Sequence, residues 1–154
     1  MNSEIPQFSV PRARIIEAFQ CYYGSEERGL SNALDYFDEV DTLYAKGGQL
    51  WRVIFVPSAD DIDVNDLGLH WTNQWNIDRV SQLMWDYHGG VNNEFIIKIQ
   101  VAPHSISVSG VDILGNVEEE EVNVSNSGIL SFEIYGRNGC LVRSGKYIEQ
   151  FAAA

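Results

Sequence analysis

Two stretches near the start of the chain repeat apolar residues every three or four positions, which is the spacing of one helix face. The first follows Pro11 and predicts a helix over 12–22, because proline is tolerated in a first helical turn. The second lies between Ser31, a favourable N-cap, and the glycine pair at 47–48, and predicts a helix over 32–45. The apolar positions are Ile15, Phe19 and Tyr22 in the first stretch and Leu34, Phe37, Val40 and Tyr44 in the second.

Most of the remaining chain has the β-branched and aromatic composition of strands. The segment 50–56 ends at a proline and predicts the first strand, followed by an acidic loop over 57–66 and a short strand within 67–72. A helix is expected to begin at Asn76, and further strands are expected over 94–101, 105–111, 117–124, 128–135 and 141–151. Two helices ahead of a strand-rich half, with too few crossover helices for a doubly wound sheet, predict an α+β fold. The length of 154 residues suits one domain spanning 1–154.

The acidic net charge disfavours nucleic acids and anionic membranes as binding partners. Twenty-two acidic residues against ten basic ones give a formal net charge of -12, and the stretch 25–66 alone carries ten acidic and three basic side chains. Lysine and arginine are what neutralise phosphates, so broad nucleic-acid binding and attachment to an anionic membrane are disfavoured. The same surplus leaves open a basic partner protein or a site that works through carboxylates.

Cysteine usage and hydropathy indicate a cytoplasmic protein. Cys21 and Cys140 lie far apart in the sequence, and the start of the chain lacks an apolar signal segment. A reducing compartment is therefore expected. The apolar run 50–56 contains Arg52 and falls far short of the roughly 18 residues that a membrane span needs.

Common metal and nucleotide motifs are missing from the sequence. Asp61, Asp63 and Asn65 have the spacing that opens a calcium loop, but Asp66 and Thr72 stand where that loop needs glycine and glutamate. The three histidines are widely spaced, so no metal site is predicted. No P-loop, nucleophile elbow or GxGxxG pattern occurs.

Two charged features stand out against these absences. Arg52 lies inside an otherwise apolar strand, where a guanidinium is costly unless it faces water at a sheet edge or has an anionic partner. Residues 118–121 are four consecutive glutamates that run directly into the β-branched Val122. Such a run is either a solvated turn or, within a strand, a pair of carboxylates on one face, which is the arrangement that glycosyl-transfer sites use.

The order of these features resembles the R, S-T-S and E-x-E motifs of arginine-class mono-ADP-ribosyltransferases. The matching segments are Leu50-Trp51-Arg52, then Leu67 to Thr72, then Glu119-Glu120-Glu121-Val122. The resemblance covers about residues 12 to 135 and implies N-terminal helices followed by a split pair of small, mostly antiparallel sheets whose cleft holds NAD. It also implies that the chain cleaves NAD as a substrate and transfers ADP-ribose to a macromolecular acceptor.

The resemblance assigns a role to each matching residue. Arg52 would bind an NAD phosphate, and His70, Trp71 and Thr72 would stand where S-T-S lines the nicotinamide ribose. Glu121 would be the catalytic glutamate. Glu119 would match the first glutamate of E-x-E, which the family associates with a protein arginine as acceptor.

Several alternatives remain open at this stage. The four-glutamate run also permits a shift of one residue, to Glu118 and Glu120, and only Thr72 retains a hydroxyl among the three S-T-S positions. The transferase fold without activity is therefore one alternative. A different class is a non-enzymatic acidic inhibitor or nucleic-acid mimic that covers a basic patch on a partner protein. A small acidic transferase of this kind is compatible with a phage or toxin effector.

Overall fold

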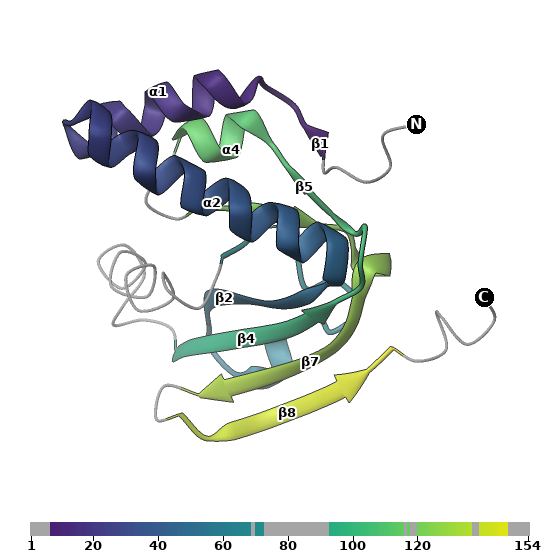
Figure 1. Ribbon diagram of the computed structural model, residues 1–154. Coiled ribbons are helices and arrows are strands. Elements are labelled where there is room, and N and C mark those ends of the chain that lie inside the picture. Colours follow the sequence, from purple (N-terminus) through teal and green to yellow (C-terminus); the bar gives the residue numbers. More distant parts are fainter. Residues whose placement is uncertain are drawn as a thin grey trace.

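Helices and two small sheets make up the part of the chain that the computed structural model describes, which is residues 7–68, 70–72, 93–115, 117, 120–136 and 139–147. The α+β prediction is confirmed (Figure 1). The helices are α1 (Arg12–Tyr23), α2 (Glu26–Lys46) and α4 (Gly110–Gly115), with single 3-10 turns at Ala59–Asp61 and Asn126–Gly128. The strands are β1 (Gln7–Phe8), β2 (Gly48–Val56), β3 (His70–Trp71), β4 (Asn93–Val101), β5 (Ile106–Val108), β6 (Val122–Val124), β7 (Ile129–Gly136) and β8 (Leu141–Lys146).

The strands form two four-stranded sheets that meet along one edge. Their orders are β1-β5-β6-β3 and β2-β4-β7-β8, and every pairing is antiparallel except that of β1 with β5. The two sheets are joined where the backbone of Trp51 in β2 exchanges two hydrogen bonds of 2.8 Å with Thr72, directly after β3. Because of this junction, β2 and β3 lie side by side although they belong to different sheets.

The helix α2 begins at Glu26, so the predicted start near residue 32 and the N-cap at Ser31 are wrong. Ser25 is the N-cap, and its hydroxyl accepts a hydrogen bond of 3.2 Å from the backbone of Arg28. Gly29 lies inside α2, where a Cβ atom would come within 2.2 Å of the backbone of Gln20 in α1. Only glycine fits at this position. The absence of a side chain at Gly29 therefore allows the two helices to pack closely.

The core lies between the helices and the inner faces of both sheets. In Figure 1, α2 runs between α1 and the sheet β2-β4-β7-β8. Each helix buries part of the apolar stripe that predicted it, although Tyr22 and Leu34 are exposed, and β4 buries every second residue. The buried residues are Ile15, Phe19, Ala33, Tyr36, Phe37 and Val40 in the helices and Phe95, Ile97, Ile99 and Val101 in β4.

Two of the predicted strands are shorter than the sequence suggested. The segment 105–111 is a strand only to Val108, after which the chain turns into α4. Among the described residues of 117–124, the strand is Val122–Val124, and the backbone of Glu120 donates to the carbonyl of Val117 ahead of it. The predicted helix from Asn76 lies outside the described residues, as does 148–151 of the last predicted strand.

No helix among the described residues combines the length and the apolar character needed to cross a bilayer. Cys21 and Cys140 are both exposed, and neither forms a disulfide bond.

Candidate functional site

Arg52 points from β2 toward the junction of the two sheets, and it does not face water at a sheet edge. Its side chain is half-buried, and Nη1 donates a hydrogen bond of 2.7 Å to the carbonyl of Leu67. Burial lowers the pKa of Arg52, while the negative charges of Glu121 and Asp66 act in the opposite direction. A guanidinium stays protonated in such surroundings. Arg52 is thus a fixed positive charge close to Glu121.

A glycine makes room for this guanidinium. A Cβ atom on Gly68 would lie 1.4 Å from Nη1 of Arg52, and the φ angle of Gly68 is +99°, in a region that side chains rarely adopt. Gly68 therefore belongs to the site, although it was not among the predicted site residues. The signal in the sequence was a lone glycine within the short motif Leu67 to Thr72.

His70 and Glu121 form the closest polar contact of the site. The imidazole Nδ1 lies 2.6 Å from Oε2 of Glu121. His70 belongs to β3, which pairs with β6, and Glu121 directly precedes β6. Because an ionised carboxylate only accepts hydrogen bonds, we assign the imidazole proton to Nδ1. The His70 side chain is 49% exposed and that of Glu121 only 14%, so the imidazole is the more accessible partner.

The backbone of Glu121 is anchored from α2. The hydroxyl of Tyr36 donates a hydrogen bond of 2.5 Å to the carbonyl of Glu121, and Tyr36 is only 1% exposed. Burial, followed by the negative charges of Glu120, Glu121 and Glu39, raises the pKa of Tyr36 well above its ordinary value. Tyr36 thus remains a neutral donor. The sequence analysis placed this part of α2 in a helix but did not recognise that a tyrosine on an apolar face brings a hydroxyl that needs a partner.

The turn ahead of β6 is strained at one residue. Glu120 has a φ angle of +45°, which is uncommon for a residue other than glycine. Strain of this kind costs about 1 to 3 kcal/mol and persists where the surroundings fix the backbone. Here the constraint from Tyr36 fixes the following residue, so Glu121 is held in one place.

The other predicted residues take different positions. Trp71 is 1% exposed, and its Nε1 donates to the carbonyl of Gly68 at 3.1 Å, so its ring belongs to the core. Thr72 is 4% exposed and joins the sheets through its backbone. Glu119 and Glu118 lie outside the described residues. The structure therefore brings His70 and Glu121 into contact and places Arg52 where it is influenced by the charge of Glu121.

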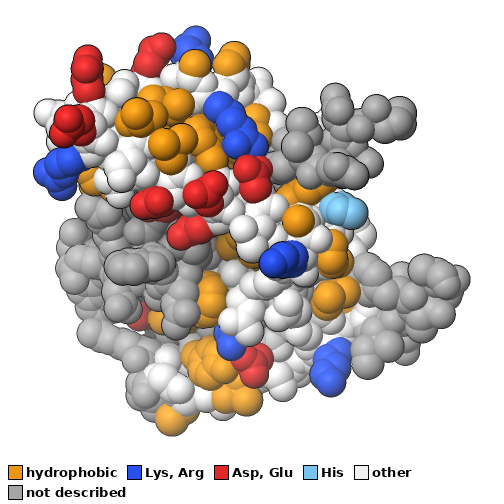
Figure 2. All heavy atoms as spheres, in the orientation of Figure 1, with side chains coloured by type: hydrophobic (Ala, Val, Ile, Leu, Met, Phe, Trp, Pro, Cys, Tyr) orange, Lys and Arg blue, Asp and Glu red, His pale blue; other side chains and the backbone are white. Residues whose placement is uncertain are grey.

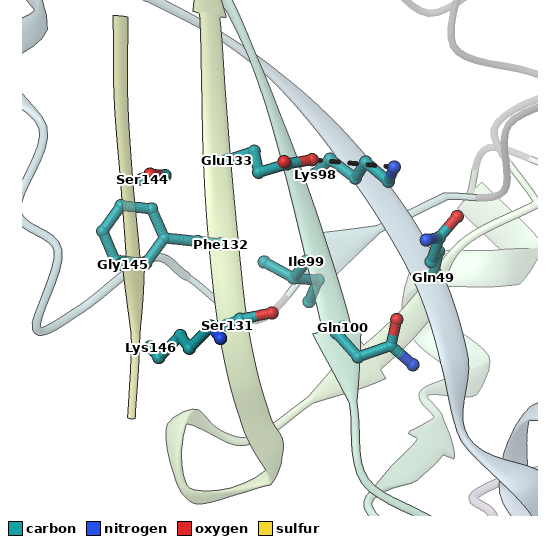
Figure 3. Close-up of a pocket in the computed structure, with 10 residues that line it drawn as sticks. All are labelled: Gln49, Lys98, Ile99, Gln100, Ser131, Phe132, Glu133, Ser144, Gly145 and Lys146. Atoms are coloured by element: carbon teal, nitrogen blue, oxygen red, sulfur yellow. Dashed lines mark ion pairs between the residues drawn. The ribbon is translucent and has the colours of Figure 1, made fainter. Parts of the chain in front are cut away.

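A cavity of about 650 Å³ adjoins His70 on the outer face of the sheet β1-β5-β6-β3. A second cavity, of about 350 Å³, lies on the sheet β2-β4-β7-β8 (Figure 3). Lys98 and Glu133 face each other there, with 3.6 Å between Nζ and Oε1. Its wall includes Gln49, which points to the opposite face of β2 from Arg52 because side chains alternate along a strand. The second cavity is thus separate from the candidate site.

The residues of the site were also considered as metal ligands. No group of three or more histidine, cysteine, aspartate or glutamate side chains with the geometry of a metal site occurs in the described ranges. Comparisons with protein-family models, curated proteins and solved structures found no match to this chain. The functional argument therefore rests on the geometry of Arg52, His70 and Glu121.

Proposed function

We propose that the chain is a mono-ADP-ribosyltransferase, which cleaves NAD and transfers ADP-ribose to a macromolecular acceptor. The observation that supports this most is that the negative charge of Glu121 acts on Arg52, beside the junction of two sheets, although the two residues lie in distant segments. The arrangement of N-terminal helices and a split pair of sheets agrees with the fold that this family would require. The finer assignment to an ADP-ribosyltransferase fold is part of the proposal.

Arg52 would hold the pyrophosphate of NAD. One of its N–H groups bonds to Leu67, and the guanidinium carries further donors that suit phosphate oxygens. Its fixed position means that little side-chain entropy is lost on binding. The fit between this donor set and a dinucleotide is one of charge and geometry, and no metal ion is needed to hold the phosphates.

Glu121 would act on the ribose that carries nicotinamide. As the bond between the ribose carbon and nicotinamide breaks, its electron pair leaves with neutral nicotinamide and positive charge develops on the ribose. A carboxylate held by Tyr36 and His70 is preorganised to stabilise that charge, and it would also accept a hydrogen bond from the ribose 2'-hydroxyl. The acceptor then bonds to the same carbon and loses its proton.

Release of nicotinamide from NAD tests this proposal. The wild-type protein should release it, and Glu121→Gln should slow the release about 100- to 1,000-fold, the usual cost of removing one electrostatic stabiliser. Glu17→Gln is the matched control, because Glu17 is exposed on α1 with no described contact to the site. Absence of release by the wild type, with cell lysate present to supply acceptors, would overturn the proposal.

A charge-based binding protein is the second candidate function. Figure 2 shows acidic side chains gathered over the region of α2, and Glu26, Glu27, Asp35 and Asp38 of that helix are exposed. This hypothesis predicts a stable complex with a basic protein whose affinity falls steeply as salt rises, because surface attraction is screened within about 8 Å at physiological ionic strength. It also predicts no nicotinamide release, so one pair of assays separates the two functions.

A further inference from the structure

Four polar side chains form a continuous row across the outer face of the sheet β1-β5-β6-β3. Strand pairing sets Gln7 opposite Ser107, Ser107 opposite Asn123 and Asn123 opposite His70. Directly paired residues project to the same side of a sheet, and the neighbouring positions along these strands are apolar and face the core. The row ends at His70, whose Nδ1 contacts Glu121.

This row lines the cavity of about 650 Å³ beside the candidate site. Ser9 and Ser109 add two hydroxyls to its wall, together with the apolar Phe8 and Val108. Two of the lining side chains are fixed by hydrogen bonds from backbone amides. Asn123 accepts a hydrogen bond of 2.9 Å from the amide of Ser109, and Ser9 accepts one of 2.6 Å from the amide of Gly110. The cavity therefore presents hydroxyl and carboxamide groups of which at least two are held in place.

The wall of this cavity contains no carboxylate among the described residues that line it. A guanidinium that left water to enter such a cavity would need an anionic partner, because an unpaired charge is costly to bury. Glu121, the carboxylate in contact with His70, is largely buried and is already paired with Nδ1. A neutral alcohol has no such requirement, since serine, asparagine and glutamine side chains can satisfy its single hydroxyl as donors or acceptors. The composition of the cavity thus favours an uncharged acceptor over an arginine.

We propose that this cavity is the acceptor subsite and that the acceptor nucleophile is an alcohol, with His70 as its general base. This inference rests on the proposed transferase function. The alcohol oxygen forms a bond to the ribose carbon as the bond to nicotinamide breaks and nicotinamide leaves with the electron pair. The alcohol proton passes to Nε2 of His70, and Glu121, on Nδ1, stabilises the imidazolium that results.

The exposed fractions of Glu121 and His70 support their separate roles at the ribose and at the acceptor. Glu121 is largely buried and is suited to the ribose, whereas His70 is half-exposed at the end of the polar row, where a bulky acceptor can reach it. A positioned base of this kind contributes about 100- to 10,000-fold to a transfer step. Nicotinamide release depends directly on Glu121 in this scheme, so the loss of His70 should reduce release less than it reduces transfer.

The test supplies the wild-type protein with NAD and either of two acceptor probes. One is a library of neutral peptides that each contain one serine, with the same peptides carrying alanine as a blank, and the other is agmatine, which carries a guanidinium. Mass spectrometry detects the ADP-ribosylated products, and nicotinamide is measured in parallel. We expect serine-dependent products at a rate at least tenfold above that with agmatine. His70→Gln should lose at least 100-fold of this transfer and a smaller factor of nicotinamide release, with Glu17→Gln as the control.

The possible outcomes separate a failure of the alcohol acceptor from a failure of the transferase function. Transfer to agmatine in preference to the serine peptides, or nicotinamide release without transfer to those peptides, overturns the alcohol assignment and leaves the transferase function standing. Equal loss of release and transfer in a folded His70→Gln overturns the role of His70. Absence of release by the wild type overturns the proposed function and this inference with it.

Discussion

His70 and Glu121 lie 51 positions apart in the sequence, yet Nδ1 of one is 2.6 Å from Oε2 of the other. The antiparallel pairing of β3 with β6 allows this contact, because it sets His70 opposite Asn123, and Glu121 lies two positions from Asn123 along the neighbouring strand, diagonally across from His70. Arg52 approaches from β2 across the junction of the sheets. Three short segments thus converge on one carboxylate, and each can be tested separately.

Tyr36→Phe should destabilise the protein and weaken the site. The substitution removes the hydrogen bond that Tyr36 donates to the carbonyl of Glu121, which costs about 1 to 3 kcal/mol. Because the turn before β6 is then less constrained, nicotinamide release should fall as well. Denaturant unfolding and release assays measure the two effects, with Tyr22→Phe as the control, since Tyr22 is 42% exposed. Unchanged stability and activity would show that Tyr36 does not anchor Glu121.

The same tyrosine predicts a dependence of stability on pH. The pKa of Tyr36 is raised in the folded state, so above a pH of about 10, the ordinary tyrosine pKa, the unfolded state loses the proton and the folded state keeps it. The free energy of unfolding should therefore fall as pH rises through this range. Tyr36→Phe should show a smaller fall, while Tyr135 and Tyr147, whose pKa values are also raised, contribute the remainder. Identical slopes in wild type and variant would contradict this assignment.

Gly68→Ala should displace Arg52. The added methyl would lie 1.4 Å from Nη1, so the guanidinium has to move away from Leu67. Gly24→Ala is the matched control, because Gly24 also has a positive φ, of +65°, but has open space around its Cβ position. Both variants should lose stability through backbone strain, and only Gly68→Ala should also lose NAD binding, as measured by calorimetry. Equal NAD affinity in the two variants would remove Arg52 from the binding site.

Arg52→Lys should weaken NAD binding while preserving the charge. Lysine lacks the planar set of donors that holds both Leu67 and a phosphate, and a hydrogen bond to a charged group contributes about 1.5 to 3 kcal/mol. We therefore expect the Kd for NAD to rise about 10- to 100-fold. Arg14→Lys, an exposed substitution on α1, should leave the Kd unchanged. An equal Kd in both variants would mean that charge alone is required at residue 52.

Asn123→Asp tests how the cavity selects an acceptor. Aspartate can still accept the hydrogen bond from Ser109, but it adds a carboxylate to a wall that has none among its described residues. The ratio of transfer to agmatine over transfer to serine peptides should therefore rise at least tenfold. Asn32→Asp adds the same charge on α2 and should leave the ratio unchanged. A ratio that does not respond would show that the cavity does not contact the acceptor.

The elements with a regular apolar period were the ones that the sequence predicted best. The stripe of α1 and the β-branched runs of β2, β4 and β7 specify their own burial, and their predicted bounds agree closely with the structure. The start of α2 was wrongly placed at Ser31, because the N-cap contact of Ser25 with Arg28 is visible only in the folded helix. A turn was one of the two readings of the glutamate run, but the positive φ angle of Glu120 could not be predicted from the sequence.

In the candidate site, too, the residues with a local sequence signal were predicted and those that act through distant contacts were missed. A guanidinium in an apolar strand signalled Arg52, and the family resemblance pointed to Glu121 and His70. Tyr36 and Gly68 were missed because each acts on a backbone or side chain that is distant in the sequence. Trp71 and Thr72 were assigned to the site by their position in a motif, whereas alternation along a strand turns Trp71 toward the core while His70 faces outward.

The central claim is that Glu121 catalyses the cleavage of NAD. The most direct measurement is incubation of the protein with NAD labelled in its adenylate moiety together with a cell lysate, comparing wild type, Glu121→Gln and Glu17→Gln. We predict labelled macromolecular product with the wild type and with Glu17→Gln, and none with Glu121→Gln, although that variant should still bind NAD. Equal labelling by wild type and Glu121→Gln, or no labelling by any of the three proteins, would contradict the account.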